Sequence, residues 1–189
     1  TPSVRQTLGY LTYRILAGLF GLLPEPVMRR IGLGLGYAAS FAARGKFRMA
    51  VRHQRRVLGE EGDAERSARR VFAQYGRYWA ETFWLRPRRR DFLIRNSDVP
   101  NVEYLHAAVN SGRGLILALP HIGNWEVAGL RAAYEGARVL AVAEALPNER
   151  VIDWFVRVRA MMDIDIVLAR RGARVTATLQ ERLEREYDL

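Results

Sequence analysis

The chain has 189 residues, of which 49% are hydrophobic and 26% are charged, a balance typical of a folded globular protein and not of a disordered one. It contains no cysteine, which excludes a disulfide framework and a thiolate zinc site. The formal net charge is +10, and residues 1–59 carry ten Lys and Arg against one acid. This surplus of cations predicts an anionic partner, either a lipid surface or a nucleic acid.

Residues 1–60 are predicted to form a basic, amphipathic, helical region that associates with a membrane. The apolar run over residues 8–23 is shorter than the roughly 20 residues that cross a bilayer, and it contains an arginine. An interfacial helix is therefore expected there, with a packed core helix as the alternative. Further helices are expected over 27–43 and 46–56, the second with a basic face. No aromatic stacking platform accompanies that face, so nucleic acid is not expected as a partner.

Residues 61–189 are predicted to form an α/β domain, a parallel-rich sheet flanked by helices. A long amphipathic helix is expected over residues 62–85. A loop or short extended piece is expected over 91–101, followed by a helix over 101–110. From residue 114 short apolar runs alternate with helical stretches, which is typical of a parallel sheet between helices. The expected strands cover 114–119, 138–143 and 165–169, and the expected helices cover 124–134, 149–162 and 173–186. A sheet of three strands is thin, so the C-terminal part of the domain is expected to be missing.

Polar residues follow each of the three expected strands. His121 comes after the first strand, Glu144 after the second and Arg171 after the third. Ligands collect at the carboxyl ends of the strands in an open parallel sheet, so we expect these side chains to meet at one edge. Arg159 shares a helical stripe with apolar residues and is expected to point partly toward the sheet.

His121 and Glu126 are the candidate catalytic pair. Asn124 is a good helix cap, which would put Glu126 in the first helical turn, within reach of the imidazole as its orienting acid. The N–H groups at this helix start suit a phosphate or an oxyanion. In the alternative interpretation, Glu126 only favours the helix dipole and His121 is a structural turn residue. The other histidines, His53 and His106, are expected to be solvated.

The segment Gly112-Arg-Gly-Leu-Ile-Leu-Ala-Leu-Pro-His-Ile-Gly-Asn-Trp-Glu126 resembles the signature of the bacterial lipid A late acyltransferases. It is also similar to their relatives, the phosphatidylinositol mannoside acyltransferases, and that branch is the nearer match. The resemblance continues through residues 52–58, 75–82, 142–144 and 155–159, so it covers nearly the whole chain. Members of the mannoside branch usually carry Asp where this chain has Glu126.

The resemblance implies an O-acyltransferase that moves a fatty acyl group from acyl-CoA or an acyl-carrier protein to a sugar hydroxyl of a glycolipid. His121 would then be the base and Glu126 its orienting acid. Glu144 and Arg159 match further functional positions of the mannoside branch. Asn124 and Arg171 complete the substrate-binding candidates. No cofactor and no metal are expected.

The expected partners are an anionic membrane surface, a glycolipid acceptor and an acyl thioester donor, with the protein peripheral on the cytoplasmic face of the bacterial inner membrane. One alternative inside the family is a lipid A-type late acyltransferase, which differs in acceptor and donor. Alternatives of another class are a basic nucleic-acid-binding protein or an anionic-membrane-binding protein without catalysis. Neither of these gives a role to the His–Glu pair.

Overall fold

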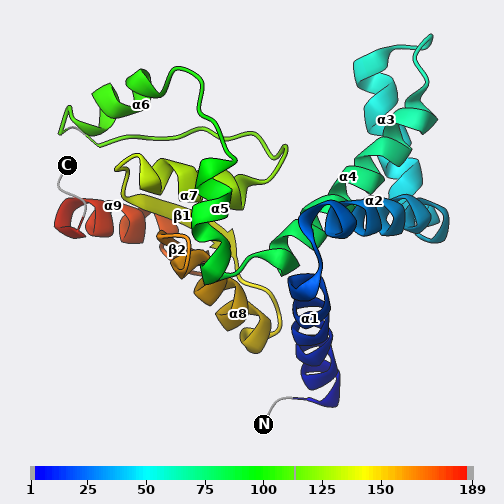
Figure 1. The fold of residues 1–189 in the computed structure, drawn as a ribbon, viewed down its shortest axis with the longest axis horizontal. Helices are drawn as coiled ribbons and strands as arrows, with labels where there is room; N and C mark the ends of the chain where they lie inside the picture. Colours follow the sequence, from blue (N-terminus) through cyan, green and yellow to red (C-terminus); the bar gives the residue numbers. More distant parts are fainter. Residues whose placement is uncertain (1–2, 113, 187–189) are drawn as a thin grey trace. The chain divides into compact units, whose positions relative to one another are not determined.

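The computed structural model describes residues 3–112 and 114–186, coloured along the chain in Figure 1. The fold divides into two compact units, one formed by Arg14–Leu85 and the other by Thr1–Tyr13 with Arg86–Leu189. The first helix, α1 (Val4–Leu22), contributes residues to both. The division by function at residue 60 stays a prediction, since compactness alone does not test it.

The Arg14–Leu85 unit is a helical assembly held by close backbone packing. Besides part of α1 it contains α2 (Glu25–Ala42), α3 (Arg44–Leu58) and α4 (Ala64–Trp84). Gly36 and Gly76 let α2 and α4 approach closely, because a Cβ added at Gly36 would lie 2.2 Å from the carbonyl oxygen of Phe72. The helices predicted from residue 27 to residue 85 are therefore confirmed, and Gly36 and Gly76 serve the packing of α2 against α4.

Buried polar contacts tie the same helices together. The carboxylate of Glu81, whose residue is only 8% exposed, accepts hydrogen bonds from the Nε atoms of Arg29 at 3.0 Å and Arg77 at 2.8 Å. The indole N–H of Trp84 donates to the carbonyl oxygen of Leu23 at 2.9 Å. Because each buried polar group has a partner, these contacts offset the cost of removing them from water.

The apolar face predicted for α1 lies exposed. Its five apolar positions are between 46% and 79% exposed, and the residues are Leu8, Leu11, Ile15, Leu19 and Leu22. The buried residues of α1 lie on another face and include Ala17 and Phe20. The core-helix alternative is therefore wrong for this stripe. Among the described helices, none combines the length and apolarity that crossing a membrane requires.

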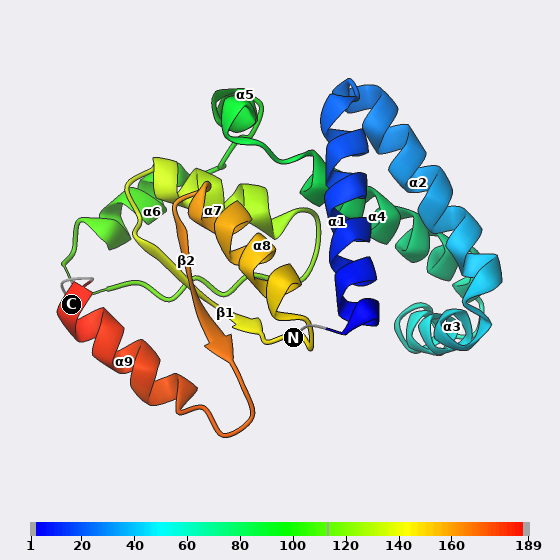
Figure 2. The same cartoon turned by 90° about the horizontal axis from the view of Figure 1, so that it is seen from below.

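The other unit has a small parallel sheet at its centre. Its elements are η1 (Pro87–Arg89), α5 (Arg90–Arg95), α6 (Val102–Val109), α7 (Trp125–Tyr134), β1 (Val139–Glu144), α8 (Glu149–Ala160), β2 (Ile164–Ala169) and α9 (Val175–Glu186). β1 and β2 pair in parallel, from Val139 opposite Ile164 to Glu144 opposite Ala169. Figures 1 and 2 show α7 on one side of this pair and α8 and α9 on the other. The predicted α/β class, two of its strands and these helices are confirmed.

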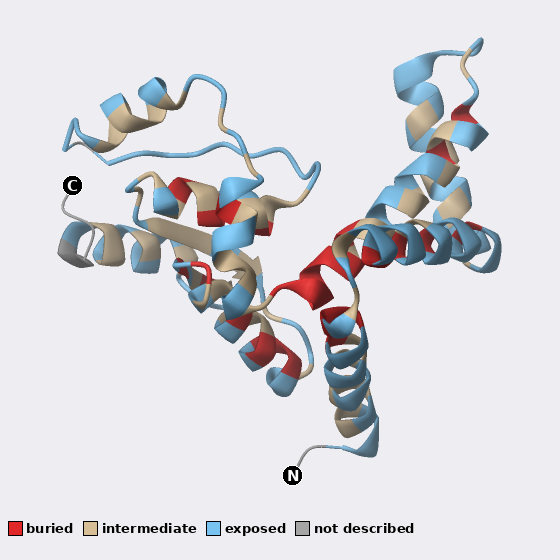
Figure 3. Cartoon of the chain, viewed as in Figure 1, coloured by how far each residue is buried: buried red, intermediate tan, exposed pale blue. Residues whose placement is uncertain are grey.

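The strand predicted over residues 114–119 is wrong. Residues 114–120 have no regular secondary structure, and every residue from 114 to 123 is exposed, as the pale blue loop before α7 shows in Figure 3. Ile116 is 94% exposed. In the described sheet β1 pairs with β2 alone, so this segment has no neighbour for its backbone N–H and C=O groups. An apolar run signals burial, but a strand also needs a hydrogen-bonding partner.

The loop or extended piece predicted over residues 91–101 is also partly wrong, because η1 and α5 occupy residues 87–95. Pro87 stands at the first position of the 3-10 turn, where its missing N–H costs nothing. Ile94 is 7% exposed, and its carbonyl oxygen accepts a hydrogen bond from Arg131 of α7 at 3.0 Å. Tertiary contact with α7 thus stabilises a helix too short to form alone.

Candidate active site

His121 lies in an exposed turn directly before α7. The backbone N–H of Ile122 donates to the carbonyl oxygen of Pro120 at 2.8 Å, which closes the turn. Gly123 follows with a φ of 64°, a left-handed conformation that glycine adopts without strain. The imidazole packs against the Trp125 indole, with the ring centroids 4.9 Å apart and the planes at 56°. The ring is therefore supported on one side and open to solvent.

Asn124 caps α7, as predicted. Its side-chain oxygen accepts hydrogen bonds from the N–H groups of Glu126 at 3.1 Å and Val127 at 3.4 Å. The cap fixes where the helix begins and puts Glu126 in the first turn. Because Asn124 already engages these two N–H groups, stabilisation of an oxyanion calls for other donors, such as an arginine.

Glu126 is buried and forms a two-pronged ion pair with Arg159. Its residue is 2% exposed, and its Oε1 and Oε2 atoms accept from the Nη2 and Nε of Arg159 at 2.7 Å and 3.1 Å. Arg159 lies in the last turn of α8, with its side chain 17% exposed and its guanidinium 5.3 Å from the Phe155 ring. The inward direction predicted for Arg159 is confirmed. A buried carboxylate needs such a partner, since an unpaired one would be very costly.

Glu144 and Arg171 lie at the same edge of the sheet. Glu144 is the last residue of β1 and stands opposite Ala169, two residues before Arg171 in the chain. Both residues are exposed. The neighbouring Arg170 forms two hydrogen bonds with Glu149, at 2.8 Å and 3.0 Å, and this contact raises the pKa of Arg170 above its ordinary value. In the part of the chain that the structure describes, Glu144 and Arg171 form no hydrogen bond or ion pair through their side chains, so an exposed carboxylate and an exposed guanidinium border the end of the strand pair.

In the described residues, His121 does not take part in the polar contacts of the other candidate site residues. Within the described ranges, no hydrogen bond or ion pair joins its ring to Glu126, Glu144 or Arg159. The absence of the strand predicted over residues 114–119 explains this separation, because that strand would have placed His121 at the edge of the sheet. The same described residues contain no group of three or more His, Asp or Glu side chains arranged to hold a metal ion.

Two polar contacts were missed from the sequence. Arg159 was expected to point inward, but its partner Glu126 lies 33 residues away on another helix. His106, which was expected to be solvated, has its Nε2 atom 2.8 Å from Glu135 Oε2, and Glu135 also pairs with Arg131. For the Glu126–Arg159 pair the sequence offered one signal: an acid in the first turn of one helix and an arginine in the last turn of another.

Residues 2–186 match the bacterial lipid A biosynthesis acyltransferase family. The match covers nearly the whole chain, so the chain belongs to this family. The predicted family resemblance is confirmed.

Individual relatives fall in one branch. A phosphatidylinositol mannoside acyltransferase from Mycolicibacterium smegmatis is 33% identical over 155 residues, which cover 80% of this chain and 50% of the relative. Two proteins of the same name from strains of Mycobacterium tuberculosis are 29% and 30% identical; the aligned regions cover 85% and 89% of this chain and 60% and 63% of those proteins. The chain thus spans between half and two thirds of the length of these relatives.

Proposed function

We propose that this chain carries the acyl-transfer site of a membrane-associated glycolipid acyltransferase, with a phosphatidylinositol mannoside as acceptor. The family match over residues 2–186 is the observation that carries the proposal. The names of the three relatives support the acceptor class. The local geometry supports the catalytic assignment, because only the turn and the Asn124 cap of α7 separate the exposed His121 from the buried Glu126 along the chain.

The proposed reaction is a direct transfer. His121 accepts the proton of a sugar hydroxyl while the oxygen attacks the carbonyl carbon of an acyl thioester. The C–S bond then breaks, and the thiolate leaves with the proton that His121 returns, so an ester and a free thiol are formed. The donor is acyl-CoA or an acylated carrier protein. An exposed imidazole suits this role, because both substrates must reach it from solvent or from a lipid surface.

Glu126 has two proposed tasks. Its pair with Arg159 anchors the first turn of α7, on which Trp125 supports the His121 ring. A carboxylate offers about four acceptor positions, so two bonds from Arg159 leave capacity for an imidazole N–H. Glu126 can therefore orient His121 when the substrates are bound, while Arg159 holds the carboxylate in place. Glu144, Asn124 and Arg171 remain the proposed substrate-binding residues.

The proposed membrane attachment is peripheral, on the cytoplasmic face of the inner membrane. The exposed apolar stripe of α1 supplies the hydrophobic contact. Helix α3 has no buried residue and no acid, and its cations are Arg44, Lys46, Arg48, Arg52, Arg55 and Arg56. Such a helix favours an anionic leaflet, with each cation near the surface contributing about 1 kcal/mol. A nucleic-acid role is disfavoured, because exposed apolar residues adjoin the cations, among them Met49 and Val57.

The test is a transfer assay with radiolabelled palmitoyl-CoA and a mycobacterial lipid extract, run on this chain and on the longest protein that the gene encodes. We expect label in a glycolipid with wild type, loss of at least about a hundredfold in His121→Ala, and unchanged activity in the control His53→Ala, whose residue is exposed on α3.

The outcomes separate the candidates. Label that enters a lipid A precursor but no phosphatidylinositol mannoside would favour the lipid A-type alternative. Transfer that survives in His121→Ala would contradict the catalytic assignment. If the longest protein that the gene encodes transfers label neither to a phosphatidylinositol mannoside nor to a lipid A precursor, the acyltransferase proposal is overturned. A basic protein that binds membranes or nucleic acid without catalysis would then be favoured.

A further inference from the structure

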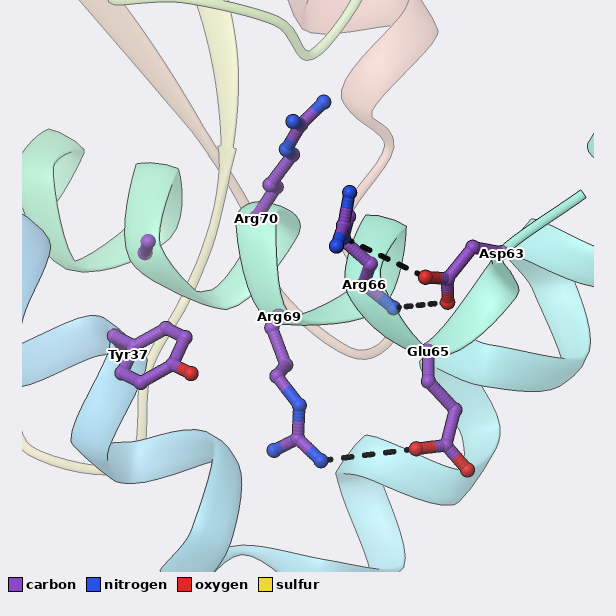
Figure 4. Close-up of a pocket in the computed structure, with 7 residues that line it drawn as sticks. Tyr37, Asp63, Glu65, Arg66, Arg69 and Arg70 are labelled. Atoms are coloured by element: carbon purple, nitrogen blue, oxygen red, sulfur yellow. Dashed lines mark hydrogen bonds and ion pairs between the residues drawn. The ribbon is translucent and has the colours of Figure 1, made fainter.

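The Arg14–Leu85 unit carries a hollow of about 520 Å³ that the proposed reaction does not use (Figure 4). It lies between α2 and the first turns of α4, and its lining residues are Tyr37, Asp63, Glu65, Arg66, Arg69, Arg70 and Ala73. Its volume is within the range of about 300–1,000 Å³ that is usual for small-molecule sites. Three arginines in the wall indicate an anionic ligand.

Two of these arginines are available to a ligand. Arg66 and Arg70 are one helical turn apart and extend to the same side of α4 in Figure 4. Arg66 pairs with Asp63 at 3.5 Å, but both side chains are more than 60% exposed, and such pairs contribute little. In the part of the chain that the structure describes, Arg70 has no ion-pair partner. Two guanidinium groups at this spacing can hold one phosphate between them.

The opposite wall is held in place by packing. The Arg69 guanidinium lies 4.5 Å from the Phe41 ring centroid and 4.8 Å from that of Phe47, and it pairs with Glu65 at 3.7 Å. Tyr37 packs edge-on against Phe41, with centroids 5.4 Å apart. The Tyr37 hydroxyl and the carboxylates of Asp63 and Glu65 can exchange hydrogen bonds with ligand hydroxyl groups. The wall therefore offers contacts to a polyol.

The hollow adjoins an apolar surface of α2. The exposed apolar residues of this helix are Val27 at 39%, Ile31 at 40%, Leu35 at 58% and Phe41 at 54%. At helical spacing Tyr37 falls at one edge of this set, so it belongs to the apolar surface and to the hollow at once. A helix that lies in the headgroup boundary with this face down would hold the hollow at the depth of lipid phosphates. A site for a soluble phosphate compound would not require exposed apolar residues beside it, so this apolar surface favours a lipid as the ligand.

We propose that this hollow binds the headgroup of an anionic membrane lipid whose phosphate carries a polyol, with the phosphate between Arg66 and Arg70 and the polyol toward Tyr37. The site is separate from the His121 turn and contributes lipid selectivity. The proposal rests on the proposed membrane attachment. It does not require turnover, so binding assays test it independently of acyl transfer.

The experiment measures binding of the whole chain to phosphatidylcholine vesicles that contain equal fractions of phosphatidylinositol or phosphatidylserine. Both lipids carry one net negative charge and only phosphatidylinositol carries a polyol, so a difference in affinity reports the polyol. We compare wild type, the double variant Arg66→Ala with Arg70→Ala, and the charge-matched control Arg48→Ala with Arg52→Ala on α3. Tyr37→Phe removes one hydroxyl without changing the charge. Thermal unfolding of each variant verifies that it is folded.

We expect wild type to bind the phosphatidylinositol vesicles about fivefold more tightly, as one or two hydrogen bonds provide. Both double variants should lose roughly 25-fold in affinity, about fivefold for each arginine. Only the Arg66 and Arg70 variant should lose the preference, and Tyr37→Phe should reduce it. The proposal is overturned if wild type shows no preference, or if the Arg66 and Arg70 variant keeps it. It is also overturned if soluble inositol 1-phosphate binds as tightly as the vesicles, which identifies a free phosphate ester as the ligand.

Discussion

The start of α7 and the segment directly before it differ sharply although they are neighbours in the chain. From Asn124 onward, a side-chain cap, a buried ion pair and apolar contacts fix the backbone. Over residues 114–123 the side chains are no less apolar, yet all of them are exposed. Hydrophobicity is therefore not what distinguishes the two regions.

The difference lies in the partners of the polar groups. A helix satisfies most of its own backbone N–H and C=O groups, and Asn124 satisfies two of those left at the start of α7. An extended segment satisfies none of its own and depends on a neighbouring strand. Where the partner is absent from the described sheet, an apolar sequence stays extended and exposed, and His121 is carried on its end.

The largest effect is expected from Arg159→Ala. The change removes both hydrogen bonds that Arg159 donates to the buried carboxylate of Glu126, and we expect the free energy of unfolding to fall by about 4 kcal/mol in urea denaturation. The double variant Glu126→Leu with Arg159→Met should be closer to wild type, because it removes both charges together. A loss below about 1 kcal/mol in the single variant would show that Glu126 is hydrated, and the contrast between the two regions would weaken.

Next comes Leu130→Ala in α7. Leu130 is 1% exposed, so the change leaves a cavity, and a loss of about 3 kcal/mol is expected. The matched change Ile122→Ala, at a residue 74% exposed in the turn before the helix, should cost less than about 0.5 kcal/mol. Equal losses at the two positions would contradict the division between a packed helix and an unpacked segment.

A smaller effect is expected from Asn124→Ala. The change removes the acceptor for two N–H groups at the start of α7 and should cost about 1 kcal/mol. Asn124→Asp keeps a capping oxygen and serves as the control, with a change within about 0.5 kcal/mol. If alanine is tolerated as well as aspartate, the cap does not set the beginning of the helix, and the position of Glu126 has another cause.

The smallest effect is expected from Ile116→Ala. At 94% exposure the side chain buries almost nothing, so the stability in urea should change by less than about 0.5 kcal/mol. The matched control is Ile152→Ala in α8, where the residue is 3% exposed and the expected loss is about 3 kcal/mol. A comparable loss at Ile116 would mean that the segment is packed in solution and that the contrast with α7 is not a property of the folded protein.

Much of the local structure was determined by the sequence alone. Helical periodicity and the Asn124 cap placed α7 within one residue of its observed start, and the short apolar runs near residues 139 and 164 predicted β1 and β2. These features depend on interactions among residues close together in the chain. The segment Gly112–Glu126 likewise sufficed to indicate the family that the match over residues 2–186 established.

Only the tertiary structure decided which side chains meet. Glu126 and Arg159 are 33 residues apart, and nothing in either local sequence specifies the pair; burial of both at one point imposes it. The segment 114–119 shows the converse, since its sequence is that of a strand and its partner is missing from the described sheet. Local sequence determines which conformations a segment favours, whereas hydrogen-bonding and ion-pair partners come from elsewhere in the chain, and their presence decides which conformation forms.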